Sequence, residues 1–191
     1  MAAPLGAATN TAYSAAFYLW VLAEAGIFVV TRRRAGDRSG DRASALVVIV
    51  GIIAALTISF GLPFLNPVLL PPTWSWVGIG FLVAGVALRV WSVATLGRYF
   101  SLRVTIQSAH RLVDWGPYRL LRHPAYSGSM LTLVGVPLAV REPVGAVLVL
   151  AIALIAFAYR MRMEERALAD ALGDDYRAYM GRTWRVVPWV W

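Results

Sequence analysis

The chain lacks cysteine and lysine, and it contains only two histidines and ten acidic residues among its 191 positions. Without cysteine there can be no disulfide, no thiolate metal site and no cysteine nucleophile. The two histidines, His110 and His123, lie thirteen residues apart, and no spacing of histidine and carboxylate resembles a known ligand set. We therefore expect no metal site.

Polar residues are scarce, because 59% of the chain is hydrophobic and only 15% is charged. Such a composition is typical of a helical integral membrane protein. The net charge of +8 comes entirely from arginine, which raises the alternative of a nucleic-acid partner. In a chain this apolar, the distribution of arginine matters more than its total, so we expect membrane lipids and a lipophilic small molecule or lipid-modified substrate as partners, and no nucleic acid.

Five apolar segments are visible, and a bilayer core needs about 20 residues per helix. The first segment lacks the basic start and the small-residue cleavage site of a secretory signal, so we interpret it as a retained span. The last two segments are shorter and are separated only by residues 141–143, which predicts a tight helical hairpin that is tilted or stops short of the far surface. The sequence thus predicts an all-α integral membrane protein, one domain over residues 1–191, with spans at about 12–30, 43–65, 74–96, 126–140 and 144–159.

The arginines predict the orientation of these spans. Five follow the first segment, five lie in the connector at 97–125, and six lie in the tail from Arg160, which together make sixteen of eighteen. The positive-inside rule then places the connector and the tail in the cytoplasm and the N-terminus outside. We expect a multi-pass protein of the cell inner membrane, with 97–125 and 160–191 as cytosolic catalytic elements. Arg89, inside the third segment, could either extend to the interface or face the bundle interior.

The stretch from Gly116 to Tyr126 holds two prolines, two arginines, two tyrosines and His123 in eleven positions. Each proline fixes its φ angle and removes a backbone donor, so this stretch is a rigid connector rather than a continuous helix. The hairpin that follows crosses the membrane and returns, and it therefore brings the tail to the same membrane face as the connector. We predict that the two together form one pocket.

Arg160 and Glu164 stand four residues apart at the cytoplasmic end of the last apolar segment. This spacing places both side chains on one face of a helix. A guanidinium and a carboxylate held together can bind opposite ends of a zwitterionic or anionic ligand. The alternative is a solvated surface pair that contributes only a few tenths of a kcal/mol. Beyond this pair, Leu168, Ala171 and Leu172 set one face of an amphipathic helix that Gly173 interrupts.

Several separated motifs follow one another in the second half of the chain. They are Leu96 to Phe100, His110 to Val113, Gly116 to Arg119, Arg122 to Tyr126 with Gly128, Glu164-Glu165 with Leu168, Leu172-Gly173, and Tyr176 to Tyr179. Together they resemble the isoprenylcysteine carboxyl methyltransferase family and its phospholipid methyltransferase relatives. The resemblance covers about residues 90–188 and is specific, because the motifs keep one order and matching spacing.

The resemblance implies a membrane methyltransferase that uses S-adenosyl-L-methionine in a cytosolic pocket. Arg160 resembles the substrate carboxylate anchor and, with Glu164, the catalytic pair. Glu164 also resembles the cofactor's partner from the last helix. The remaining positions implied to bind the cofactor are Gln107, His110, Arg111, Leu112, Val113, Tyr118, His123, Pro124, Ala125 and Tyr126.

The expected reaction is carboxyl methylation of an isoprenylcysteine-like lipophilic acceptor. A carboxylate acceptor needs no base, whereas an amine or thiol acceptor would give up a proton to Glu164 or a histidine. A phospholipid amine or thiol methyltransferase is therefore an alternative. An NADPH-dependent membrane reductase of similar architecture and a non-catalytic membrane scaffold are the others.

Overall fold

The structure, a computed structural model, describes residues 6–35, 42–61, 69–100 and 112–191, with the backbone alone for 32–35 and 42–45. In these ranges the regular elements are helices and two short 3₁₀ turns, which confirms the predicted all-α class. The helices are α1 (Ala7–Ala35), α2 (Arg42–Gly61), α3 (Thr73–Leu96), α4 (Pro124–Ala139), α5 (Pro143–Leu172) and α6 (Asp174–Arg182).

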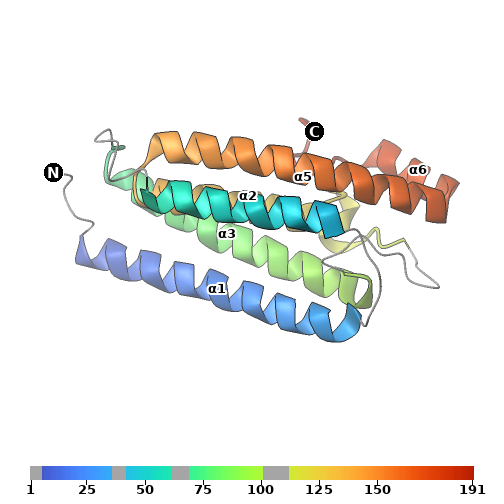
Figure 1. The fold of residues 1–191 in the computed structure, drawn as a ribbon, viewed down its shortest axis with the longest axis horizontal. Helices are drawn as coiled ribbons and strands as arrows, with labels where there is room; N and C mark the ends of the chain where they lie inside the picture. Colours follow the sequence, from blue (N-terminus) through green and yellow to red (C-terminus); the bar gives the residue numbers. More distant parts are fainter. Residues whose placement is uncertain (1–5, 36–41, 62–68, 101–111) are drawn as a thin grey trace.

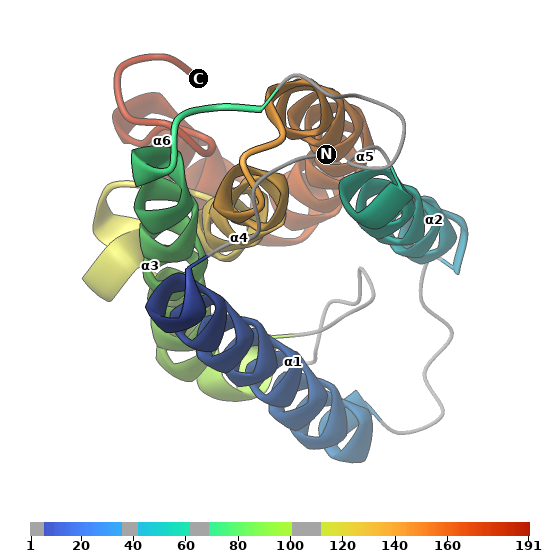
Figure 2. The same ribbon diagram turned by 90° about the vertical axis from the view of Figure 1, so that its left-hand side faces the viewer.

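The first five helices run side by side along the long axis of the molecule, and α6 lies at the end of the bundle beside the last turns of α5 (Figure 1). Viewed from the end, α4 lies between α3 and α5, with α1 against α3 and α2 against α5 (Figure 2). Most residues of α4 are buried as a result. The first turn of α4 is thus held on two sides by long helices.

Three helical stretches of the described chain are long and apolar enough to cross a membrane: Ala7–Thr31, Thr73–Tyr99 and Pro143–Leu172. Helix α2 offers a shorter apolar stretch, Leu46–Gly61, and α4 has 16 residues. Each of the five predicted spans therefore corresponds to a helix, but length and composition support a crossing for three of them. The described part of the second helix reaches Gly61, and the predicted bound at residue 65 falls among residues 62–68, which lie outside the described part.

The hairpin at the end of the chain forms as predicted, and its second arm continues as a helix into the polar tail. Helix α5 starts at Pro143, one residue after Glu142, whose buried carboxylate accepts a hydrogen bond from the amide of Gly145. It then continues unbroken past residue 159 to Leu172. Gly173 adopts a φ of 61°, in the left-handed region that glycine tolerates, and this turn separates α5 from α6. The predicted interruption at Gly173 is confirmed.

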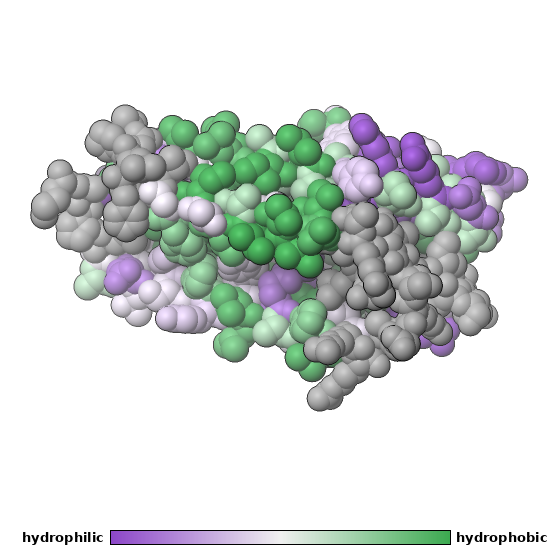
Figure 3. Space-filling model, viewed as in Figure 1, coloured by the Kyte–Doolittle hydropathy of each residue, from purple (hydrophilic) through white to green (hydrophobic). Residues whose placement is uncertain are grey.

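Large apolar side chains cover the outside of the bundle. On α2 and α5 they form an apolar band, whereas hydrophilic residues gather where α5 continues toward α6 (Figure 3). The exposed apolar residues of these two helices include Leu46, Ile49, Val50, Ile53, Val147, Leu148 and Ile155. An apolar exterior of this kind matches a lipid environment, where hydrocarbon replaces water as the solvent.

Glycines bring α3 and α4 into backbone contact. A Cβ added to Gly85 would lie 2.6 Å from the carbonyl oxygen of Gly128, and one added to Gly128 would lie 2.7 Å from the carbonyl oxygen of Gly85. Two turns farther along, a Cβ added to Gly135 would lie 2.8 Å from the carbonyl oxygen of Gly78, and one added to Gly78 would meet the backbone of Leu138 and Ala139. Small residues at such an interface let two membrane helices approach closely and pack by van der Waals contact. We call these four glycines the α3–α4 glycine seam.

Arg89 faces the interior of the bundle, which decides between the two orientations considered from the sequence. Its guanidinium forms an ion pair with Glu24 of α1 and donates to Ser129 of α4. The side chain of Arg89 retains 12% of its accessible surface. A charge so placed is costly within an apolar bundle and needs these partners.

Candidate active site

The connector and the tail meet at one end of the bundle through backbone hydrogen bonds. The amide of Arg122 donates to the carbonyl of Trp184 at 2.7 Å, and the amide of His123 donates to the carbonyl of Arg185 at 2.9 Å. In return, the amide of Trp184 donates to Leu120 at 3.1 Å. The predicted meeting of these two segments is confirmed, and it precedes the first turn of α4 directly.

Glu165 of α5 holds the connector and the tail together at this junction. Its carboxylate accepts hydrogen bonds from Arg122 at 2.9 Å and from Arg185 at 2.8 Å, and it lies 3.3 Å from Nε2 of His123. The side chain of Glu165 is 7% exposed. Arg122 also donates to the carbonyls of Met180 and Thr183 at the end of α6 and just beyond it. One buried carboxylate thus links α5, the connector and the tail.

Tyr126 stands beside this junction, at the third residue of α4, and bridges two residues of α5. Its hydroxyl donates to Oε2 of Glu164 at 2.9 Å and accepts from Nε of Arg160 at 3.2 Å. Its ring stacks on Phe157, with centroids 5.1 Å apart, and lies 5.5 Å from the imidazole of His123. Arg160 is 3% exposed. We call Arg160, Tyr126 and Glu164 the Tyr126 bridge.

Two more tyrosines close the end of the bundle. Tyr179 of α6 donates its hydroxyl to the carbonyl of Tyr118 at 2.7 Å, and Tyr118 lies in a 3₁₀ turn at Gly116–Arg119. Burial is the main reason that the pKa of Tyr118 rises well above its usual value, and the nearby carboxylate of Glu164 raises it further. The pKa of Tyr179 is also raised, chiefly by burial. Both hydroxyls therefore stay protonated at neutral pH.

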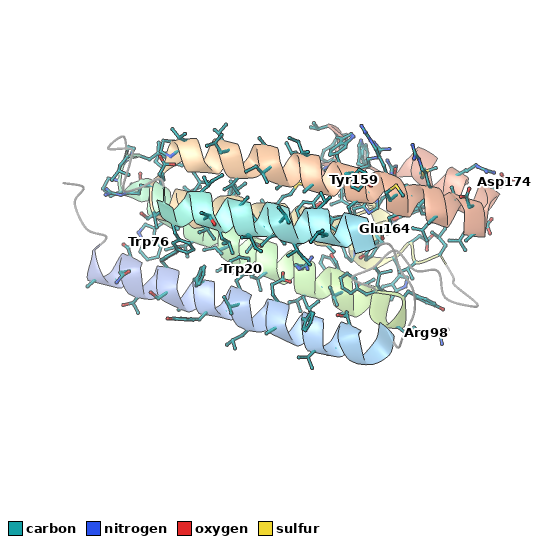
Figure 4. All side chains as sticks on the ribbon, in the orientation of Figure 1. Trp20, Trp76, Arg98, Tyr159, Glu164 and Asp174 are labelled. Atoms are coloured by element: carbon teal, nitrogen blue, oxygen red, sulfur yellow. The ribbon has the colours of Figure 1, made fainter. Side chains whose placement is uncertain are left out.

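The structure brings together several of the residues predicted from the sequence. Arg160 and Glu164 both form hydrogen bonds with the hydroxyl of Tyr126, and Tyr118 lies within electrostatic reach of Glu164. Pro124 and Ala125 form the buried start of α4. Figure 4 shows Glu164 on α5 toward the same end of the bundle as Arg98, and far from Trp76 at the other end.

Other predicted positions contribute differently or are not described. His123 is buried, with its Nε2 directed at Glu165 rather than at Glu164. Leu112 and Val113 are half-buried in the connector. Gln107, His110 and Arg111 lie outside the described residues.

Sequence reasoning gave no role to three residues that hold the junction together: Glu165, Arg122 and Arg185. Glu165 and Arg122 stood inside quoted motifs, and their charge was the available signal. Arg122 and Glu165 are separated by 43 residues, and Tyr179 and Tyr118 by 61. Nothing in local spacing indicates such partners.

The arrangement suits recognition of a molecule that carries both charge and apolar surface. The Tyr126 bridge offers a guanidinium, a carboxylate and a hydroxyl side by side, next to the aromatic faces of Tyr126 and Phe157. Because a guanidinium has five N–H donors, Arg160 can hold Tyr126 and a carboxylate together. The fold is that of a small helical protein whose apolar exterior matches lipid.

Comparison with known proteins gives the family. The model of the isoprenylcysteine carboxyl methyltransferase (ICMT) family matches residues 77–170. Protein-S-isoprenylcysteine O-methyltransferase A of Arabidopsis thaliana is 31% identical over 156 residues, which cover 77% of this chain and 78% of that protein. The chain belongs to the isoprenylcysteine carboxyl methyltransferase family, as the sequence motifs predicted.

A second relative and a solved structure extend this result. The probable protein-S-isoprenylcysteine O-methyltransferase of Oryza sativa subsp. indica is 30% identical over 118 residues, which are 61% of this chain and 62% of that protein, so the match spans less than two thirds of its length. A solved structure of the eukaryotic intramembrane Ras methyltransferase ICMT shares the fold, with a TM-score of 0.72 and 18% identity. The match covers 100% of this chain and 70% of the chain in that structure. The chain is therefore a multi-pass integral membrane protein with the ICMT-like fold.

Proposed function

We propose that this protein is an S-adenosyl-L-methionine-dependent methyltransferase that acts on a lipophilic acceptor at the membrane. The preferred reaction is carboxyl methylation of an isoprenylcysteine-like substrate. The observation that carries the proposal is the Tyr126 bridge, in which Arg160 and Glu164 share one hydroxyl at the end of the bundle where the connector and the tail are joined. Family membership supports the reaction class.

The residues present fit the methyl donor. Its aminoacid end carries an ammonium and a carboxylate, which match Glu164 and the donors of the connector, and its adenine ring matches the aromatic faces of Tyr118 and Tyr126. When bound, S-adenosyl-L-methionine supplies an electrophilic sulfonium methyl group. We assign donor binding to Tyr118, His123 to Tyr126 and Glu164, together with Gln107 and His110 to Val113 from the sequence motifs.

Arg160 acts on the acceptor in this proposal. Its buried guanidinium, 3% exposed, binds the acceptor carboxylate through a charge-assisted hydrogen bond. Tyr126 holds Nε of Arg160, and Glu164 accepts from Tyr126, so the carboxylate orients the guanidinium through the hydroxyl. In-line transfer needs mainly such positioning and the exclusion of water.

We also propose the orientation and the remaining crossings. All five helices α1–α5 cross or enter the bilayer, the N-terminus lies outside, and the joined connector and tail lie in the cytoplasm of a cell inner membrane. The basis is the distribution of arginine, with sixteen of eighteen in segments assigned to one side. The methyl donor then reaches the site from water, and the acceptor reaches it from the lipid.

Isotope transfer tests the function. The full chain is purified in detergent and incubated with donor labelled in its methyl group, first with a farnesylated N-acetylcysteine and then with a total lipid and small-thiol extract. Label in a base-labile methyl ester supports the carboxylate reaction, whereas label in an amine or thioether assigns the alternative acceptors. Lack of S-adenosylhomocysteine binding by calorimetry, with NADPH stabilising the protein instead in a thermal-shift assay, would assign the reductase alternative.

A further inference from the structure

A second polar group lies on the opposite flank of α4 from the Tyr126 bridge. Arg89 of α3 donates from Nη2 to Oε2 of Glu24 on α1 at 2.9 Å, and from Nη1 to the hydroxyl of Ser129 on α4 at 2.8 Å. Nη1 also donates to the carbonyl of Ala125 at 3.3 Å. Three helices thus meet at one guanidinium.

The charged pair of Arg89 and Glu24 costs folding free energy that the packing of apolar side chains alone would avoid. The side chain of Arg89 is 12% exposed and that of Glu24 is 33% exposed, inside helices whose other faces are apolar. Burying two charges requires desolvation, and apolar side chains of similar volume would often hold helices together as well or better. Ionisable residues inside membrane helices usually serve a function, with their partner beside them.

The contact to Ala125 connects this group to the proposed active site. Ala125 immediately precedes Tyr126 in the first turn of α4. Its carbonyl accepts from Nη1 of Arg89 at 3.3 Å and from the hydroxyl of Ser129 at 3.1 Å. Ala125 contacts Arg89 of α3, and its neighbour Tyr126 contacts Arg160 and Glu164 of α5, so the two polar groups reach adjacent residues of the same turn.

We propose that Arg89, fixed by Glu24, is a positioning residue for methyl transfer. It holds the first turn of α4 through the Ala125 carbonyl and Ser129, and it thereby keeps the hydroxyl of Tyr126 between Arg160 and Glu164. Glu24 fixes the guanidinium and makes α1 part of the site's support, although α1 contributes no group to the Tyr126 bridge. This role rests on the proposed function above.

If Arg89 only stabilised the packing of the helices, its substitution would give different results from those expected of a positioning residue. The substitution would lower the unfolding midpoint, and the protein that remained folded would keep its kcat. A positioning residue changes kcat more than the KM for the acceptor, because Arg160 still binds the acceptor but the transfer geometry is disturbed.

The test uses the full chain in detergent, S-adenosylhomocysteine binding by calorimetry, and methyl transfer to a farnesylated N-acetylcysteine. Arg89→Met is expected to lower kcat about tenfold with KM for the acceptor within about threefold of the original. Arg89→Lys keeps the charge opposite Glu24 and one donor, and it should recover most of the loss. The matched control is Arg177→Met, since Arg177 pairs with Asp174 on the exposed surface of α6, and its kcat should be unchanged.

Unchanged kcat in folded Arg89→Met, or equal losses in Arg89→Met and Arg177→Met, would overturn the positioning role. Should Arg89→Met fail to fold, Ser129→Ala decides, because it removes a donor to Ala125 without leaving a charge alone. A kcat reduced about threefold supports the proposal, and an unchanged kcat overturns it. If the unsubstituted chain neither binds S-adenosylhomocysteine nor transfers methyl groups, the proposed function itself fails and the positioning role falls with it.

Discussion

Glu164 and Glu165 are neighbours on α5, yet they belong to two different regions of the molecule. Glu165 is 7% exposed and is held by Arg122, Arg185 and His123. Glu164 is half-buried and, among the contacts of the described residues, accepts a hydrogen bond from Tyr126. Consecutive residues on a helix point about 100° apart, so one step along the chain separates the two environments.

The difference shows how the same chemical group can serve stability or chemistry. The cations around Glu165 use both of its oxygens to join the tail to the connector, which leaves that carboxylate little capacity for a ligand. Within the described part of the chain, Glu164 has one neutral donor, Tyr126, and the cation Arg160 lies on the other side of that hydroxyl. We therefore propose an assignment in which Glu165 has a structural role and Glu164 a chemical one.

The largest expected effect is on stability, at Glu165. Glu165→Gln leaves two guanidinium groups beside an uncharged amide in a buried place, and breaking such a network should cost about 3 kcal/mol of unfolding free energy. Thermal unfolding in detergent, followed by tryptophan fluorescence, measures the change against Glu164→Gln as the matched control. Equal midpoints for the two variants would contradict the assignment.

The next effect is on catalysis, at Arg160. Arg160→Ala removes the proposed carboxylate anchor, and methyl transfer should fall about a hundredfold, which corresponds to about 2.7 kcal/mol of transition-state stabilisation. Initial rates with labelled donor measure it, with S-adenosylhomocysteine binding as the check that the donor site persists. A variant that keeps its full kcat/KM would remove Arg160 from the mechanism.

A smaller catalytic effect is expected at Glu164. Glu164→Gln keeps an acceptor for the hydroxyl of Tyr126 but removes the charge that orients Arg160, so kcat should fall about tenfold while the unfolding midpoint stays the same. The rate of methyl transfer and the midpoint of thermal unfolding are measured on the same preparation. Loss of stability with full activity would reverse the roles of the two glutamates.

The smallest effect is expected on the surface. Asp174 is 97% exposed and forms an ion pair with Arg177 three residues later at the start of α6. Water and salt screen such a pair, so Asp174→Asn should change neither the midpoint nor the rate within error. A clear loss of activity would mean that the active site extends onto α6.

The helices and the Tyr126 bridge were partly predictable from the sequence. Apolar runs located all five long helices, Gly173 marked the end of α5, and the four-residue spacing of Arg160 and Glu164 placed both on one face. These features depend on local periodicity, which a single sequence carries.

The supporting contacts were not predictable because they join distant residues. Arg89 and Glu24 are 65 positions apart, and Arg122 and Glu165 are 43 apart. Which of several arginines finds which carboxylate depends on how the helices pack, and packing is not encoded in local spacing.

The α3–α4 glycine seam limits the routes by which a substrate can arrive. The backbones of the two helices touch at Gly85 and Gly128 and again at Gly78 and Gly135, which leaves no width for an acyl or prenyl chain between them. A lipophilic molecule that moves from the lipid to Tyr126 must therefore approach another side of α4. Because contact between the two backbones closes one side of α4, larger residues elsewhere on α4 can select which molecule approaches.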